Sequence, residues 1–331
     1  MAAQPKVFVT RRIPDAGLNR IREHCEAEIW PEPLPPPYDV LRSKVGVCDG
    51  LVSLLTDRID AGLLDAAPRL KVVSNFAVGF NNIDVPAATA RGIAVGNTPG
   101  VLTDATADMA FCLMIAAARR VVEGHQYTLS GQWKTWEPLG HLGQDLAGRV
   151  LGVVGMGRIG YALARRCRLG WDMQVLYCDV MRSEKAEKDL QARQVDFDTL
   201  LRESDFVSIH TDLNEKTRGM FGPEQFKKMK RTAVLINSAR GPLVNQQALA
   251  EALKKGTIFA AGLDVTDPEP PSPDDPLLKL PNVVVAPHIA SATVGTRNAM
   301  AQICADNLVA GVSGQKLPAW VNPEVESKRR Q

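Results

Sequence analysis

Short apolar runs alternate with stretches of helical periodicity along the first hundred residues. Strands and helices that alternate in this way build a parallel sheet with helices on both of its faces. The pattern therefore predicts a small α/β unit at the start of the chain. Its strands are expected at residues 7–10, 27–30, 50–55, 70–74 and 93–95.

The pattern changes after residue 97, where a Thr-Pro-Gly turn at 98–100 precedes a helical stretch over 103–120. The middle of this helix, residues 109–118, is apolar nearly all round. Such a helix is buried on more than one side, which suits a domain junction or a dimer interface. We place the first domain boundary here. Residues 121–148, with Trp133 and Trp136, are expected to be irregular.

Further apolar runs follow from residue 150 onwards, and a helix is expected over 299–311, crossing back to the first unit. The runs are enough for a full Rossmann sheet, an open parallel sheet that binds dinucleotides. The fold class predicted from the whole chain is therefore α/β, with two doubly wound domains. The strands of this second sheet are expected at 150–154, 173–178, 206–210, 233–237, 260–264 and 283–286.

The first run of the second sheet leads into a glycine-rich turn and then a helix over 161–169. Gly155 would make the tight turn, Gly157 would let the backbone approach a pyrophosphate, and Gly160 would let helix and strand pack closely. The helix N-terminus offers free N–H groups and a positive dipole end to phosphates. Strand, glycines and helix in this order predict a dinucleotide site.

Asp179 ends the next run, roughly 20 residues beyond the glycines, where a carboxylate accepts hydrogen bonds from an adenosine ribose. A carboxylate there would repel the 2′-phosphate of NADP(H). We therefore expect NAD(H) to be favoured over NADP(H), although nearby Arg182 blurs the preference.

Composition and charge disfavour several classes of protein but do not identify the function. The chain has 331 residues, 45% hydrophobic and 23% charged, which fits two globular domains. A net charge of +2 gives no reason to expect nucleic acid or an anionic membrane as partner. The six cysteines lack CxxC spacing, which indicates reduced thiols and a cytoplasmic protein, and no metal site is visible. Residues 1–6 leave no room for a signal peptide, and no apolar stretch is long enough to cross a bilayer.

Polar side chains follow three successive strands of the second sheet, at the edge where ligands bind open α/β sheets. Arg240 can hold a carboxylate and polarise the neighbouring carbonyl. His288 can give a proton to the alkoxide that forms on hydride transfer, and Glu269 can fix its tautomer. Each residue alone is more often structural: a surface arginine, a loop acid or a core histidine. Together they favour hydride transfer at a 2-oxo or 2-hydroxy acid.

Two segments remain open to more than one interpretation. The backbone N–H groups of Val78 and Gly79, in a glycine-centred turn, could hold a carboxylate. An ordinary strand-to-helix turn explains the same residues, and physical reasoning alone favours it. Trp136 could anchor a dimer contact, or the segment around it could pack over its own domain.

At this point the chain resembles the D-isomer-specific 2-hydroxyacid dehydrogenase family, and within it the glyoxylate/hydroxypyruvate reductases. The resemblance covers nearly the whole chain, and several long motifs in the family's order are far more specific than the glycine turn alone. They are NFAVGFNNID at 75–84, LGVVGMGRIG at 151–160, INSARGPLV at 236–244, GLDVTDPEP at 262–270 and PHIASAT at 287–293.

The resemblance implies a catalytic trio, Arg240, Glu269 and His288, and a substrate carboxylate bound by the amides of Val78 and Gly79. It implies a discontinuous, flavodoxin-like substrate domain (1–102 plus 292–331) and a dinucleotide-binding domain (103–291), with a homodimer built on the helix 103–120. Further cofactor contacts are expected from Arg158 and Ile159 at the pyrophosphate, and from Thr106, His210, Ser238, Ala239 and Asp264. Leu54, Leu55 and Trp136 are expected at the substrate end, together with Arg240, His288 and Ser291.

Two departures from the family pattern bear on the cofactor. Mammalian glyoxylate reductases that prefer NADPH lack an acid at the position of Asp179. His-Thr-Asp at 210–212 replaces the common His-Val-Pro, which puts details of the adenine wall in doubt.

The leading hypothesis is the reduction of glyoxylate or hydroxypyruvate to the D-2-hydroxy acid. A phosphoglycerate dehydrogenase-like enzyme is the enzymatic alternative. A dinucleotide-sensing scaffold of the corepressor type is an alternative from another class, because such relatives keep the same trio.

Overall fold

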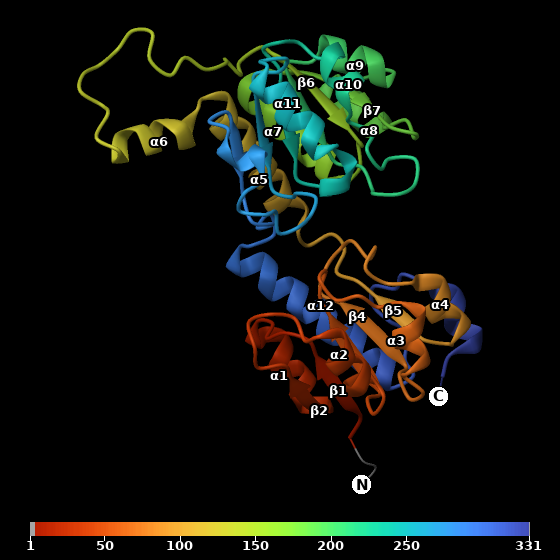
Figure 1. The fold of residues 1–331 in the computed structure, drawn as a ribbon. Coiled ribbons are helices and arrows are strands. Elements are labelled where there is room, and N and C mark those ends of the chain that lie inside the picture. The colour runs from red at the N-terminus through yellow and green to blue at the C-terminus, as the bar shows by residue number, and fades with distance from the viewer. Residues whose placement is uncertain (1–3, 331) are drawn as a thin grey trace. The chain divides into compact units, whose positions relative to one another are not determined.

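A computed structural model describes residues 4–330 of the chain. The chain divides into two compact units. Unit 1 comprises Met1–Leu102 and Ala292–Gln331, and unit 2 comprises Thr103–Ser291. Both are α/β units built on parallel sheets (Figure 1), so the predicted fold class is confirmed.

Unit 1 is built on a five-stranded parallel sheet with the order β2-β1-β3-β4-β5. Each of the runs expected there contains a strand. Strands β1, β3, β4 and β5 are largely buried, as strands covered on both faces of a parallel sheet are, whereas the edge strand β2 is partly exposed. This order is that of flavodoxin-like sheets. The strands are β1 (Lys6–Val9), β2 (Glu26–Ile29), β3 (Gly50–Ser53), β4 (Val72–Asn75) and β5 (Ala94–Gly96).

Helices cover both faces of this sheet. On one face α1 (Asp15–His24) packs against α12 (Val294–Val312), the helix that returns from the end of the chain. The contact is close: a Cβ added at Gly17 would lie 2.5 Å from the carbonyl oxygen of Ala301. The other face is covered by α2 (Tyr38–Val45), α3 (Ala61–Asp65) and α4 (Val85–Ala90). A short 3₁₀ helix, η3, spans Pro323–Lys328.

Unit 2 is built on a seven-stranded parallel sheet with the order β12-β11-β10-β9-β6-β7-β8. Counted from β6, this is the Rossmann order with one strand added at an edge. Sequence patterning missed only β8, because its two residues are exposed and polar. The strands are β6 (Val150–Val154), β7 (Gln174–Cys178), β8 (Arg193–Gln194), β9 (Phe206–Ile209), β10 (Val234–Asn237), β11 (Ala260–Leu263) and β12 (Val283–Val285).

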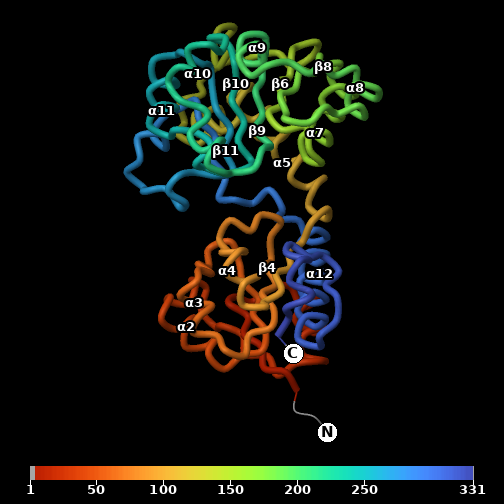
Figure 2. The backbone as a smooth tube through the Cα atoms, turned by 90° about the vertical axis from the view of Figure 1, so that its right-hand side faces the viewer, coloured from red at the N-terminus to blue at the C-terminus, as the bar shows by residue number. Residues whose placement is uncertain are grey.

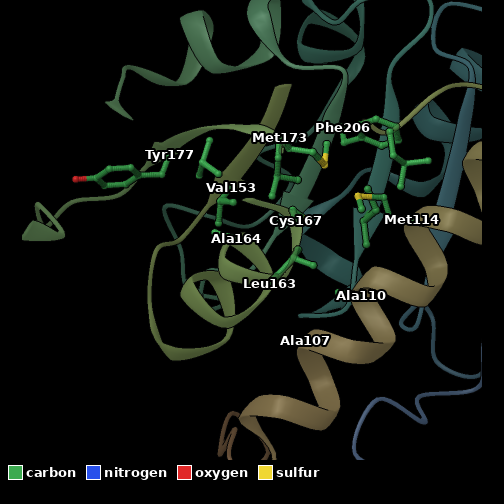
Figure 3. Packing of buried hydrophobic residues seen from close by; sticks show 14 of the residues in the cluster. Ala107, Ala110, Met114, Val153, Leu163, Ala164, Cys167, Met173, Tyr177 and Phe206 are labelled. Carbon is green, nitrogen blue, oxygen red and sulfur yellow. The ribbon is translucent and has the colours of Figure 1, made fainter. Parts of the chain in front are cut away.

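The helices of unit 2 lie on both faces of its sheet (Figure 2). One apolar cluster on each face holds them against the strands. In the first, α5 (Thr103–Ala118) and α7 (Arg158–Trp171) place alanine, leucine and methionine side chains against the strands (Figure 3). Helix α8 (Glu184–Leu190) joins the same cluster. The opposite face carries α9 (Phe197–Glu203), α10 (Pro223–Lys228) and α11 (Gln246–Lys254), with the 3₁₀ helices η1 (Gly241–Leu243) and η2 (Pro276–Lys279).

The helix expected over 103–120 is shorter than the pattern suggested. It ends at Ala118, because Arg120 takes a left-handed conformation with φ 52°. A second helix, α6 (Val121–Leu129), then occupies part of the segment expected to be irregular, so that expectation was wrong for these residues. Helix α6 and the loop after it extend away from the rest of unit 2 (Figure 1). Within residues 4–330, no helix combines the length and apolar character needed to cross a membrane.

Candidate active site

The glycine-rich turn joins β6 to α7 at the carboxyl end of the unit 2 sheet. Gly155 has φ 95°, and a Cβ there would lie 2.7 Å from the carbonyl carbon and oxygen of His210. A Cβ at Gly160 would lie 2.1 Å from the carbonyl oxygen of Gly155. These positions need glycine, because a side chain would collide with the backbone that it packs against.

The N-terminus of α7 is open to an anion. Its first helical residue is Arg158, its N-cap is Gly157, no side chain caps it, and no acid stands in its first turn. A Cβ at Gly157 would meet nothing within 4 Å. The free N–H groups and the dipole of a helix start suit a phosphate. The turn therefore fits a pyrophosphate, with Arg158 and Ile159 in the first turn of the helix.

Asp179 stands just past β7 and is partly buried. Its Oδ2 accepts a hydrogen bond from the Met156 amide at 2.7 Å, and its Oδ1 accepts one from the Met181 amide at 3.0 Å. The carboxylate is thus fixed beside the glycine-rich turn. A carboxylate can accept about four hydrogen bonds, so it retains capacity for a ribose hydroxyl.

The other residues expected at the cofactor lie in different environments. Ser238 is buried, and its Oγ has no hydrogen-bond partner within the described chain, which fits a contact to a bound group. His210 lies just past β9 with its Nε2 2.8 Å from the Ser208 hydroxyl, and burial lowers the pKa of its imidazole to about 4. Thr106 is buried on α5. Ala239 stands in the turn after β10.

Arg240 projects from that turn, which the buried side chain of Asn237 organises. The Asn237 Nδ2 donates to the Arg240 carbonyl at 2.9 Å, and its Oδ1 accepts from the Ala239 amide at 3.1 Å. The Arg240 Nη1 donates to the Ala239 carbonyl at 2.6 Å. Burial lowers the pKa of the Arg240 guanidinium, while the nearby charges of Glu269 and Asp212 oppose that shift.

His288 and Glu269 form a direct pair. The His288 Nδ1 lies 2.5 Å from the Glu269 Oε1, and the two side chains are 28% and 41% exposed. His288 also has φ 53°, a left-handed conformation that is rare for a residue with a side chain and that recurs at functional sites. Because Glu269 occupies Nδ1, the ring can exchange a proton with a ligand only through Nε2. The three residues, called the trio below, therefore gather at one edge of the sheet.

Asp264 positions the histidine. Its two carboxylate oxygens accept hydrogen bonds from the amides of Ile289 and Ala290, each at 2.8 Å. Its carbonyl oxygen accepts from the His288 amide at 2.9 Å. Burial raises the pKa of this carboxyl, and the two amide bonds oppose the shift. Sequence reasoning assigned Asp264 to the cofactor and missed this role, which depends on a loop far along the chain.

Gly241 allows the turn that carries Arg240 to pack against the turn that leads to Glu269. A Cβ at this position would lie 1.8 Å from the Thr266 carbonyl oxygen. Gln246 adds a second link, because its Oε1 accepts from the Asp267 amide at 2.9 Å. Sequence reasoning missed both residues, and the only available signal was a glycine directly after the candidate arginine.

In unit 1, the turn Ala77–Gly79 has its carbonyl groups tied to neighbouring segments. The Thr98 amide donates to the Ala77 carbonyl at 2.8 Å. The Asn97 Nδ2 donates to the Val78 carbonyl at 2.8 Å, and the Asn75 Nδ2 donates to the Gly79 carbonyl at 2.9 Å. No hydrogen bond within residues 4–330 uses the amides of Val78 or Gly79. The turn therefore presents two adjacent N–H groups, the arrangement that holds an anion.

Leu54 and Leu55 stand beside this turn, just past β3. Asn82 links the segments, since its Nδ2 donates to the carbonyls of Leu54 at 3.0 Å and Asp57 at 3.1 Å. Both leucines are partly buried.

Two further residues expected at the substrate belong to unit 2. Trp136 is 80% exposed on the loop beyond α6. Ser291 is the last residue of the unit and is partly buried. In the described part of the chain, no three side chains of the metal-binding types gather closely enough to hold an ion.

Comparisons with known proteins point to one family. The sequence model of the D-isomer specific 2-hydroxyacid dehydrogenase, NAD binding domain, matches residues 111–290. A glyoxylate reductase of Korarchaeum cryptofilum is 54% identical over 327 residues, 98% of each chain. A crystal structure of a protein from Thermus thermophilus superposes with a TM-score of 0.89 at 45% identity, over 96% of this chain and 99% of that one. An NADPH-dependent glyoxylate/hydroxypyruvate reductase of Sinorhizobium meliloti, in complex with NADP and malonate, gives a TM-score of 0.85 at 32% identity over 99% of each chain.

Proposed function

Because the chain belongs to the D-isomer-specific 2-hydroxyacid dehydrogenase family, we propose that it reduces glyoxylate or hydroxypyruvate to the D-2-hydroxy acid with NADH. It is an NAD(P)-dependent dehydrogenase, and this family reduces 2-oxo acids. The observation that carries the proposal is the Glu269–His288 pair at 2.5 Å, in which Asp264 fixes the His288 loop at the carboxyl end of a dinucleotide-binding sheet.

Each member of the trio has a separate task in the proposed reaction. When bound, the reduced nicotinamide supplies a hydride to the carbonyl carbon. His288 donates its Nε2 proton to the carbonyl oxygen as negative charge develops there. The Glu269 carboxylate keeps the Nδ1 proton in place, which fixes the tautomer and stabilises the charged ring. The Arg240 guanidinium polarises the carbonyl and pairs with the substrate carboxylate.

The turn Ala77–Gly79 is proposed to bind the substrate carboxylate through the amides of Val78 and Gly79. Three tied carbonyls hold the turn in one conformation, so the amides are oriented before a ligand arrives. Preorganised donors of this kind need no rearrangement on binding. Leu54 and Leu55 would shape the site for a small substrate.

NADH is proposed as the preferred cofactor. Asp179 lies where a ribose 2′-hydroxyl would be bound, and its charge would repel a 2′-phosphate. Replacing Asp179 with alanine should therefore improve the use of NADPH relative to NADH. An unchanged ratio of kcat/KM for the two cofactors would refute this role. Gly155, Gly157, Gly160, Arg158 and Ile159 would hold the pyrophosphate.

A homodimer is proposed to form through α5, α6 and the loop after α6. Helix α6 and the loop after it carry large apolar side chains that are exposed in the single chain, and exposed apolar patches of this kind mark interfaces. Trp136 would reach the substrate end of the partner. The exposed side chains are Val121, Val122, Leu129, Trp133, Trp136, Leu139 and Leu142.

We also place the protein in the cytoplasm, since all six cysteines are free thiols.

The test is to follow the oxidation of NADH and NADPH with glyoxylate, hydroxypyruvate, pyruvate and phosphohydroxypyruvate. We expect the highest kcat/KM with NADH and one of the first two acids. A preference for phosphohydroxypyruvate would move the assignment to a phosphoglycerate dehydrogenase-like enzyme. Tight dinucleotide binding without turnover of any 2-oxo acid would favour a dinucleotide-sensing scaffold.

A further inference from the structure

The loop after β7, residues 179–183, is fixed at both of its ends. At its start, the Asp179 carboxylate accepts from the amides of Met156 and Met181. At its end, the Ser183 amide donates to the Tyr177 hydroxyl at 2.9 Å. The Tyr177 ring is fully buried, and its hydroxyl points away from the apolar cluster (Figure 3). The loop that would meet the adenosine ribose is therefore anchored to the core.

The same hydroxyl also anchors an acid on α8. The Tyr177 hydroxyl donates to Glu187 Oε1 at 2.8 Å, and the Glu187 side chain is only 23% exposed. Glu187 in turn holds Arg182, whose side chain is 68% exposed. The Arg182 Nε donates to Oε2 at 2.9 Å, and its Nη2 donates to Oε2 at 2.6 Å. The carboxylate is the fixed partner, so it decides where the guanidinium lies.

This pairing bears on cofactor choice, because dinucleotide-binding proteins accommodate a 2′-phosphate with an arginine near the ribose-binding acid. Arg182 stands three residues after Asp179, and guanidinium groups bind phosphates through paired N–H donors. Both its Nε and its Nη2 are already used by Glu187.

We propose that Glu187 is a specificity-determining residue, which favours NADH by withholding the Arg182 guanidinium from a 2′-phosphate. The inference rests on the proposed function, in which this loop binds the adenosine end of the dinucleotide. Asp179 then acts on the 2′-phosphate directly through its charge, and Glu187 acts through Arg182. The competing explanation is a surface ion pair that only stabilises the loop, which would alter the binding of both dinucleotides alike.

The experiment measures dissociation constants for NADH and NADPH without any 2-oxo acid, by calorimetric titration. It compares the original protein with Asp179→Ser, Asp179→Ser/Glu187→Gln, and the triple variant that adds Arg182→Gln. Glutamine at 187 keeps an oxygen that can accept from the Tyr177 hydroxyl, so the loop retains its anchor. Asp189→Asn in the Asp179→Ser background is the matched control, because Asp189 lies on the same helix but pairs with Lys185 and Tyr161.

We expect Glu187→Gln to tighten NADPH binding of the Asp179→Ser protein by roughly 5-fold, the effect of freeing one exposed ion pair. The dissociation constant for NADH should change less than about 2-fold. The Asp189→Asn control should change neither the NADH nor the NADPH dissociation constant. Adding Arg182→Gln should cancel the gain. Three results would overturn this inference and leave the proposed function standing. They are tighter NADPH binding that survives the Arg182→Gln substitution, equally tighter binding of both dinucleotides, and unchanged NADPH binding in a protein that still binds NADH. Failure of the original protein to bind either dinucleotide would overturn the proposed function as well.

Discussion

Each unit offers groups for ligand binding at the carboxyl end of its own sheet, and the two units do so in different ways. Unit 1 offers backbone amides, those of Val78 and Gly79, and uses side chains only to tie the carbonyls of the same turn. Unit 2 offers the side chains of the trio, and it uses the buried side chains of Asn237 and Asp264 to hold the backbone of the loops that carry Arg240 and His288. The backbone site has no chemical signature of its own in the sequence, whereas the trio displays its chemistry in its residue types.

The largest effect is expected when the trio loses its proton donor. His288→Ala should lower kcat by about 100-fold or more, because general acid catalysis contributes at least that much. The dissociation constant for NADH should stay within about 2-fold. Steady-state kinetics and calorimetric titration check both expectations, with His24→Ala, an exposed histidine of unit 1, as control. A near-normal kcat would remove His288 as the proton donor.

Gly241→Ala should have the next largest effect, since its Cβ would lie 1.8 Å from the Thr266 carbonyl. The turns that carry Arg240 and Glu269 must then move apart. We expect kcat/KM to fall by about 30-fold through misplacement of the trio, and the free energy of unfolding to fall by about 2 kcal/mol. Kinetics and denaturant unfolding provide the measurements. Gly170→Ala, which meets nothing within 4 Å, is the control, and equal behaviour of the two variants would contradict this account.

The backbone site of unit 1 is tested by Asn97→Ala, which removes the donor to the Val78 carbonyl. Loss of this partly buried hydrogen bond should loosen the turn and raise KM for the 2-oxo acid by about 10-fold. NADH binding should not change, because the trio and the glycine-rich turn belong to unit 2. Initial rates over a range of substrate concentrations give KM, with Asn19→Ala, an exposed asparagine of α1, as control. If KM stays the same, the turn does not depend on this tie.

The smallest effect concerns the pH dependence of stability in unit 2. Burial lowers the pKa of His210 to about 4 in the folded chain, so the unfolded chain binds more protons below its ordinary value of 6.5. Stability should therefore fall as the pH decreases through this window. Because the ring is partly exposed, we expect a loss of about 1 kcal/mol between about pH 7 and about pH 5. Denaturant unfolding at both pH values should show a smaller loss for His210→Asn, and identical losses would refute the assignment.

Most of the sheet strands were predictable, because each is an apolar run bounded by turns. Strand β8 was not, since Arg193 and Gln194 are polar and exposed and pair only through their backbones. Helix α6 was missed for a different reason: its exposed face carries apolar residues, so the usual helical alternation is absent.

The residues of the candidate site likewise divide into those that the sequence reveals and those that it does not. The residue types of the trio, the glycines and Asp179 indicate their chemistry in the sequence. The role of Asp264 as the support of residues 288–290, and the need for glycine at position 241, arise only when distant loops meet. The tied carbonyls of Ala77–Gly79 likewise depend on Asn97 and Thr98, which follow a different strand.

The most direct test of the central claim, that His288 passes the proton while Glu269 holds its other nitrogen, is a crystal structure with NADH and oxamate, an unreactive analogue of a 2-oxo acid. The account predicts the His288 Nε2 at about 3 Å from the oxygen of the analogue's amide carbonyl, with Nδ1 still bonded to Glu269. An imidazole turned away from that oxygen, or another side chain in its place, would contradict it.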